Sequence, residues 1–192
     1  CTRGGAAGTG GAAAASDFPP LKREDPLYPC SVLGERYLAA CYQMQTSAIL
    51  QLNEFDVSVA ASACPGAPEP FISTCFQSLG RDISALTVQD HDQALEMCGQ
   101  VPESYRHFCH LGYAKNLVDL TADHGDGFAF CRILPEGASK RTCYIGMGEQ
   151  LWVLEPSGPI RGDLCLAAEE GYVEACLMGA GVEAAGLTPS RS

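Results

Sequence analysis

The sequence predicts an all-α fold, an α-solenoid of about five helical hairpins of roughly 34 residues, each closed by an internal disulfide. Ten of the eleven cysteines fall into five pairs, with separations of 11, 11, 11, 12 and 11 residues. The first members of successive pairs are 34, 34, 33 and 34 residues apart. Apolar residues recur around each pair at helical spacing, so one two-helix unit is predicted to repeat along the chain.

The second helix of each unit is marked by a glutamate five residues after the first cysteine. These residues are Glu35, Glu69, Glu103, Glu136 and Glu170, and the middle three follow Pro68, Pro102 and Pro135. Proline suits the first helical turn, where its missing N–H is no loss. A carboxylate there faces the positive end of the helix dipole. We therefore expect a second helix to begin at each Pro-Glu pair.

One face of each second helix is predicted to be core. Four residues before the second cysteine stand Tyr37, Phe71, Tyr105 and Tyr172, with Ser139 as the exception, and eight residues after it stand Ile49, Ile83, Leu117, Leu151 and Ala184. These positions share a helical face with the cysteine. Glycines recur three or five residues after it, as Gly80, Gly112, Gly146, Gly148, Gly179 and Gly181. Glycine in a helix costs up to ~1 kcal/mol relative to alanine, so their recurrence predicts a close neighbouring helix.

The repeat also predicts which cysteines pair. Bonded cysteines need Cα atoms roughly 4.4–6.8 Å apart, while packed helix axes lie about 8–10 Å apart, so only facing positions near the turn can be bridged. The predicted disulfides are Cys30–Cys41, Cys64–Cys75, Cys98–Cys109, Cys131–Cys143 and Cys165–Cys176. The alternative of ten free buried thiols does not explain the phased pairs. No C-x2-C or C-x-x-C-H motif occurs, so neither a zinc site nor covalent haem is predicted.

The units follow a low-complexity segment. Residues 1–25 are rich in glycine and alanine and predict a flexible tether with a reach of about 25–30 Å. Residues 26–187 form the predicted repeat domain, and residues 188–192 a tail. The expected helices are 34–52 in the first unit, 53–63 with 70–86, 90–101 with 102–120, a fourth pair after a turn at 123–127, and 159–168 with 171–185.

The composition restricts the partners that the protein can bind and the compartment in which it is expected. The formal charge is −11 and the pI is near 4.6, which disfavours nucleic-acid binding. No apolar run is long enough to predict a transmembrane helix. Ten phased cysteines predict an oxidising compartment and therefore an exported protein.

The first residue is the unpaired cysteine, Cys1, followed by the Gly/Ala segment. This arrangement resembles a mature bacterial lipoprotein. The resemblance implies acyl chains on Cys1, a membrane anchor on the periplasmic or extracellular side, and, with Thr2 next, sorting to the outer membrane of a Gram-negative cell. Several acyl chains give stable anchoring, whereas one is marginal. A chain that merely starts at cysteine, or a thiol for intermolecular pairing, is the alternative.

Residues 26–187 resemble the Sel1-like and tetratricopeptide classes of α-solenoid in repeat length and in the disulfide of each unit. The tetratricopeptide pattern W-x2-L-G-x2-Y is absent and the cysteine spacing is longer than expected for Sel1-like repeats. The resemblance is one of architecture.

Four short motifs have both a chemical and a structural interpretation. Asp90-His91-Asp92 and Arg161-Gly162-Asp163, the latter matching the integrin tripeptide, fall at expected helix starts and are interpreted as caps. His107 and His110 stand three residues apart and could share a metal with a carboxylate, but exposed polar positions are favoured. Residues 123–127 have acidic and glycine content that would suit calcium, yet lack the EF-hand pattern, so a turn is predicted.

No catalytic motif, phosphate loop or dinucleotide fingerprint occurs. We therefore expect no catalytic residue, metal or cofactor. Helical arrays bind through extended surfaces. The predicted function is a lipid-anchored scaffold or accessory subunit that docks on another envelope or membrane protein, for example in an electron-transport or photosynthetic complex. The alternatives are a metal- or redox-active protein that uses its cysteines or histidines, and a self-assembling structural protein.

Overall fold

The computed structural model describes residues 22–88 and 90–183. All regular structure in these residues is helical, so the predicted all-α class is confirmed. The second helices are α1 (Glu35–Tyr42) with α2 (Gln45–Leu52), α4 (Glu69–Thr87), α6 (Glu103–Thr121), α8 (Ala138–Leu154) and α10 (Val173–Gly179). The first helices are α3 (Val57–Ala63), α5 (His91–Gly99), α7 (His124–Ile133) and α9 (Gly158–Cys165). Short 3-10 turns are η1 (Cys30–Val32), η2 (Cys64–Gly66) and η3 (Glu170–Tyr172).

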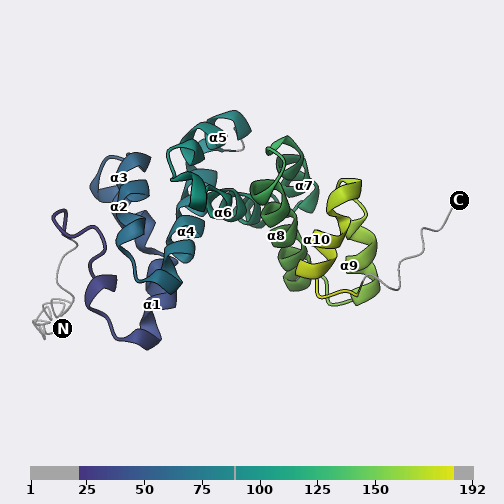
Figure 1. The fold of residues 1–192 in the computed structure, drawn as a ribbon, viewed down its shortest axis with the longest axis horizontal. Helices are drawn as coiled ribbons and strands as arrows, with labels where there is room; N and C mark the ends of the chain where they lie inside the picture. Colours follow the sequence, from purple (N-terminus) through teal and green to yellow (C-terminus); the bar gives the residue numbers. More distant parts are fainter. Residues whose placement is uncertain (1–21, 89, 184–192) are drawn as a thin grey trace, which may run out of the picture.

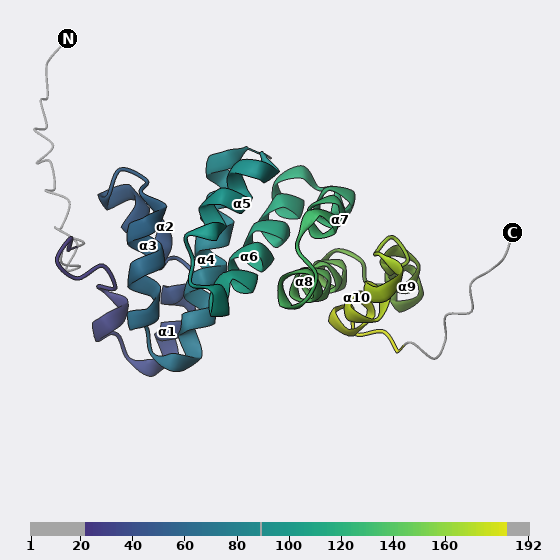
Figure 2. The same ribbon diagram turned by 45° about the horizontal axis from the view of Figure 1, so that its top comes forward.

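The hairpins follow one another in chain order along an arched row (Figure 1). Helices α3, α5 and α7 lie along its upper side, and α4, α6, α8 and α10 run side by side below them. Figure 2 shows the same sequence of neighbours after rotation, with α1 and α9 toward opposite ends of the row. The second helices therefore form a continuous layer that contacts the first helices on one side and is open on the other.

Each hairpin is closed by a buried disulfide near its bend. The five bonds are Cys30–Cys41, Cys64–Cys75, Cys98–Cys109, Cys131–Cys143 and Cys165–Cys176, which are the pairs that the spacing predicts. Their Cα–Cα distances lie between 5.6 and 5.8 Å. Each bond closes a short loop, for which the chain-entropy estimate is about 2–3 kcal/mol of stability.

The phased glycines let neighbouring second helices touch through their backbones. A Cβ placed on Gly80 of α4 would lie 2.0 Å from the Cys109 carbonyl oxygen of α6, and one on Gly112 would lie 1.9 Å from that of Gln77. The same reciprocal contact joins α8 and α10, where Gly148 and Gly179 each leave 2.0 Å between an added Cβ and a carbonyl oxygen. Close helix approach, predicted from the glycine spacing, is confirmed at these two interfaces.

Aromatic residues form a second repeating contact between units. Rings stack in the pairs Tyr42–Phe71, Phe76–Tyr105 and Tyr144–Tyr172, with centroids 5.6, 5.1 and 5.2 Å apart. In each pair, the residue directly after one second cysteine meets the residue four positions before the next. Tyr37 has no preceding unit and is 49 % exposed, so the prediction that this aromatic series is core is wrong for its first member.

The core of each second helix lies where the periodicity places it. Ile49, Ile83, Leu117 and Leu151 are each at most 1 % exposed. Ala184, the fifth member of that series, lies outside the described residues, as do residues 1–21 of the predicted tether and the tail at 188–192.

Three helix starts differ from the expectation. Pro68 and Pro102 stand at the N-cap rather than inside the helix, with Glu69 and Glu103 first in α4 and α6. In the fourth unit, Pro135-Glu136 precedes the helix, because Gly137 adopts a φ of 108° and α8 begins after it. This glycine absorbs the extra residue of the one pair that is separated by 12.

Two other segments also differ. The expected helix 34–52 is divided into α1 and α2 at Gln43 and Met44. The predicted turn at 123–127 is instead the start of α7, since the Asp123 side chain accepts a hydrogen bond from the Gly125 N–H, at 2.7 Å, and caps that helix. Glycine lowers helix propensity, but the cap and burial of Gly127 outweigh that preference here.

A substitution at Gly80 tests the backbone contact. Gly80→Ala should lower the free energy of unfolding by about 1–3 kcal/mol, because α4 and α6 must separate to admit a methyl group between their backbones. Urea unfolding of the oxidised protein measures the change.

Gly99→Ala is the matched control, because a Cβ on Gly99 meets nothing within 4 Å. It should be neutral or stabilise by up to ~1 kcal/mol through helix propensity. Equal unfolding midpoints for the two variants would contradict the close approach.

Candidate functional site

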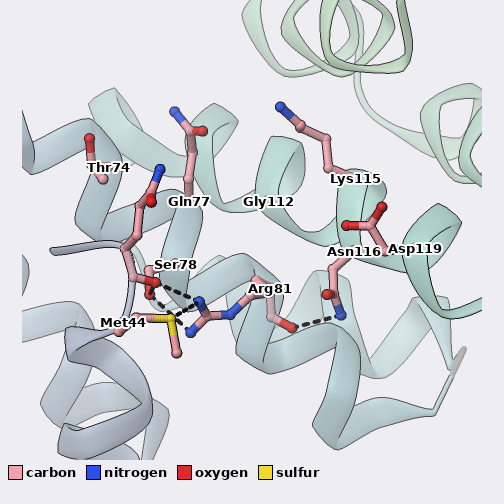
Figure 3. Close-up of a pocket in the computed structure, with 10 residues that line it drawn as sticks. Met44, Thr74, Gln77, Ser78, Arg81, Gly112, Lys115, Asn116 and Asp119 are labelled. Carbon is pink, nitrogen blue, oxygen red and sulfur yellow. Dashed lines mark hydrogen bonds between the residues drawn. The ribbon is translucent and has the colours of Figure 1, made fainter. Parts of the chain in front are cut away.

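A groove runs across the open side of the second helices. A polar section of about 330 Å³ extends from the break between α1 and α2 across α4 to α6 and is shown in Figure 3. It is lined by Gln43, Met44, Thr74, Gln77, Ser78, Arg81, Gly112, Lys115, Asn116 and Asp119. Figure 3 shows the Gln77 and Lys115 side chains extending over the open space above Gly112. The section is therefore floored by glycine and walled by amide, hydroxyl and charged groups.

Arg81 organises one end of this groove. Its guanidinium donates to the Gln43 carbonyl oxygen at 2.5 Å and to the Ser47 hydroxyl at 2.7 Å, and it pairs with Asp82 at 2.6 Å. Asp82 in turn accepts from Thr46 at 2.7 Å and from Ser47 at 2.9 Å. The network satisfies the carboxylate and fixes α4 against the break between α1 and α2.

A polar contact repeats along the same face. The Asn116 amide donates to the Arg81 carbonyl oxygen at 3.2 Å, and the Gln150 amide donates to the Lys115 carbonyl oxygen at 3.1 Å. Both donors stand seven residues after a second cysteine, and both acceptors stand six residues after the preceding one. These side-chain bonds join adjacent second helices and keep the wall of the groove in register.

A second section of about 460 Å³ continues the groove across α8 toward α10. It is lined by Lys115, Glu149, Trp152, Val153, Gly179 and Gly181. Lys115 belongs to both sections and bonds Glu149 at 3.0 Å. The groove changes along its length from amide-rich at α2–α6 to partly apolar at α8–α10.

The junction between the third and fourth units is irregular. Here His110 and Ser139 occupy the two positions that stack as aromatic rings elsewhere, and a Cβ on Gly146 would meet the Leu111 side chain at 2.0 Å rather than a carbonyl. His110 is 2 % exposed, and its Nδ1 has no hydrogen-bond partner in the described residues. Burial, with Arg106 and His107 nearby, lowers the pKa of His110 to about 4. His110 is therefore a neutral core residue, and the expectation of an exposed polar position is wrong for it.

The junction between the fourth and fifth units holds a buried lysine. Lys140 Nζ bonds Glu136 at 2.8 Å and Glu169 at 3.1 Å. Tyr144 donates to Glu169 at 2.9 Å, and Tyr172 donates to Glu136 at 2.6 Å. The hydrogen bond to Glu136 raises the pKa of Lys140, and burial together with Glu169 raises the pKa of Tyr144 to about 12. Every charge has a partner, so this cluster stabilises the packing of the two units.

Asp90 and Arg161, from the two motifs that were interpreted as helix caps, both have structural roles. Asp90 caps α5 by accepting from the Gln93 N–H at 3.0 Å, as predicted. Arg161 is only 7 % exposed and lies inside α9, donating to the carbonyl oxygens of Glu155 at 2.8 Å and Ala180 at 3.0 Å. The interpretation of Arg161 as a cap is wrong, and its burial removes it from the reach of an integrin.

The described residues contain neither a cluster of metal ligands nor a membrane-spanning helix. Within 22–88 and 90–183, no three histidine, cysteine or acidic residues are placed to share a metal ion. No helix in the same ranges has the length and apolar character needed to cross a bilayer. Cys1, the predicted lipidation site, lies outside the described residues. Five disulfides are typical of an oxidising, exported environment.

No family model, curated protein or solved structure matches this chain. The comparisons therefore show no named family, and the function must be argued from the surface.

The buried His110 generates a pH prediction. Its folded-state pKa, about 4, lies below the ordinary value of 6.5, so its contribution to stability is complete above pH 6.5 and is lost as pH falls toward 4. Between pH 7 and 4.5 the loss is on the order of 2–3 kcal/mol. Urea unfolding at the two pH values measures it.

The comparison protein is His110→Phe, which places a ring where Tyr42, Phe76 and Tyr144 stand in other units. Its free energy of unfolding should fall less over the same pH interval, by about the same 2–3 kcal/mol. An identical decrease in both proteins would refute the assignment of a buried neutral imidazole.

Proposed function

We propose that this protein is an exported, membrane-anchored scaffold or accessory subunit that binds another envelope protein along the groove of its second helices. The observation that carries the proposal is the groove itself, which extends over all five units and is lined mostly by side chains outside the buried core. An electron-transport or photosynthetic complex of the envelope is one setting for such a subunit.

The groove is built for recognition by contact. Disulfides and backbone contacts hold the helices, so the lining residues are presented on a rigid support. Preorganised side chains lose little conformational entropy when a partner binds. Amide and hydroxyl groups at α2–α6 supply directional hydrogen bonds to a protein partner, and the apolar surface at α8–α10 supplies area to be removed from water.

Anchoring is proposed to use acyl chains on Cys1, with the Gly/Ala segment as a spacer. Such a tether keeps the repeat domain near the membrane surface while leaving the groove accessible. The outer membrane is the proposed location, following the resemblance of the first residues to a lipoprotein.

Partner binding is tested with a pair of matched variants. Gln77→Arg puts a bulky cation into the groove, whereas Gln93→Arg makes the same change at an exposed position on α5. Affinity isolation from detergent-solubilised membranes should recover the same envelope protein with the wild type and Gln93→Arg. Gln77→Arg should lose most of it.

Two outcomes would count against this proposal: recovery of no specific partner with the wild type, or equal recovery with both variants. Circular dichroism of each variant establishes that the helices are retained.

Anchoring has a separate test. Cys1→Ala should move the protein from the membrane fraction to the soluble fraction without changing its unfolding midpoint, because Cys1 takes no part in the five disulfides. Fractionation followed by denaturant unfolding measures both properties. A Cys1→Ala protein that stays tightly on the membrane would exclude the acyl anchor.

A further inference from the structure

Trp152, the one tryptophan of the chain, is an exposed residue with a fixed ring. It stands near the end of α8 and is 56 % exposed, and the adjacent Val153 is 75 % exposed. Both line the second section of the groove. Leaving this much apolar surface in water is unfavourable, at about 25 cal/mol per Å². A patch of this kind is characteristic of a binding surface.

Two neighbouring residues, Arg161 and Gly181, hold the Trp152 indole in place. The Arg161 guanidinium carbon lies 4.4 Å from the ring centroid. Arg161 itself is fixed by its bonds to the carbonyl oxygens of Glu155, Pro156 and Ala180, between 2.8 and 3.0 Å. Gly181 has a φ of 61°, and a Cβ there would come within 2.6 Å of the ring. The indole is therefore a rigid platform, and rigid aromatic anchors dominate many protein interfaces.

One acid, Glu149, and two cations, Lys115 and Arg161, surround the platform, and both cations are already hydrogen-bonded. Lys115, the cation that lines this section, is already paired with Glu149. The Glu149 side chain is 47 % exposed, and its Oε1 accepts no hydrogen bond from the described residues. The whole chain carries a formal charge of −11, and the face of an indole attracts cations.

We propose that the Trp152 platform, with Val153 and Glu149, binds a positively charged amphipathic segment of the partner protein. An arginine or lysine of that segment lies against the indole and bonds Glu149, and an adjacent apolar side chain covers Val153. This inference rests on the proposed function and identifies the chemistry of the partner at the α8–α10 end of the groove.

Because the chain has one tryptophan, its fluorescence reports on this site alone. The full chain is titrated with a synthetic 12-residue peptide of lysine and leucine, and with the same peptide carrying glutamate for lysine. The lysine peptide should shift the emission to shorter wavelength and saturate, with weaker binding at high salt as the charges are screened. The glutamate peptide should cause no shift.

Two variants, each lacking one negative charge, test whether Glu149 is the acid that binds the lysine peptide. Glu149→Gln should weaken binding of the lysine peptide about fivefold, the upper range for an exposed ion pair. Glu96→Gln, at an exposed acid on α5, should bind as the wild type does. Neither substitution removes a core contact, so folding is retained in both.

Several results would overturn the inference. These are no shift with the lysine peptide, equal shifts with both peptides, equal affinities of Glu149→Gln and Glu96→Gln, or a shift caused by a neutral oligosaccharide in place of the peptide. A chain ending at Glu183 that already differs in emission would show that residues 184–192 cover the ring.

The partner isolation separates this inference from the function on which it rests. Trp152→Ala should reduce recovery of the envelope partner. Unchanged recovery with Trp152→Ala, when Gln77→Arg abolishes it, rejects the platform and leaves the groove. No specific recovery with the wild type rejects the function itself.

Discussion

The structure depends on a covalent constraint, the disulfide at the bend of every hairpin. The first helices are short, with seven residues in α3, nine in α5 and eight in α9. Isolated helices below about 12–15 residues are marginal in water. A buried bond at the bend restricts the unfolded chain and holds each short helix where it can pack on a longer partner. Five such bonds let residues 22–88 and 90–183 maintain an open, elongated arrangement.

Backbone contacts between neighbouring second helices keep the distance between successive units regular. Glycines admit a neighbouring carbonyl at α4–α6 and again at α8–α10, and stacked rings fix the rotation of one helix against the next. Two departures from the repeat fall between the third and fourth units, His110 in the aromatic series and Leu111 against Gly146. A third, the extra residue at Gly137, lies in the bend of the fourth unit. The array thus consists of two regular stacks joined by an irregular junction. Lys115 and Glu149 bridge that junction on the surface, and the two sections of the groove meet there.

The sequence was sufficient to predict the fold because the repeat carries its information in buried positions. Disulfide pairs, core apolar residues and close glycines all recur in phase. The turns after α2, α4 and α6 include the left-handed residues Glu54, Val88 and Ala122, and none of these is a glycine that would have marked the conformation. All three stand thirteen residues after a second cysteine, so the phase was available but the residue type gave no signal. The groove was missed for a related reason. Most of its residues occupy surface positions, where the fold does not require a particular residue type to recur in each unit. Asn116 and Gln150 are an exception, because both stand seven residues after a second cysteine.

This separation between core and surface explains how a regular fold can carry different side chains along one face. The position six residues after the second cysteine is occupied by Ser47, Arg81, Lys115 and Glu149 in successive units. The backbone presents all four on the same face, yet the side chains change from hydroxyl to cation to anion. Because disulfides, glycines and buried rings supply the stability, these residues are free to differ without loss of the fold. Under the proposed function, a partner that spans the groove would meet a fixed order of chemical groups, from the amides of Gln43 and Gln77 to the indole of Trp152. Its recognition would then depend on that order and on the spacing between hairpins, which the core holds constant.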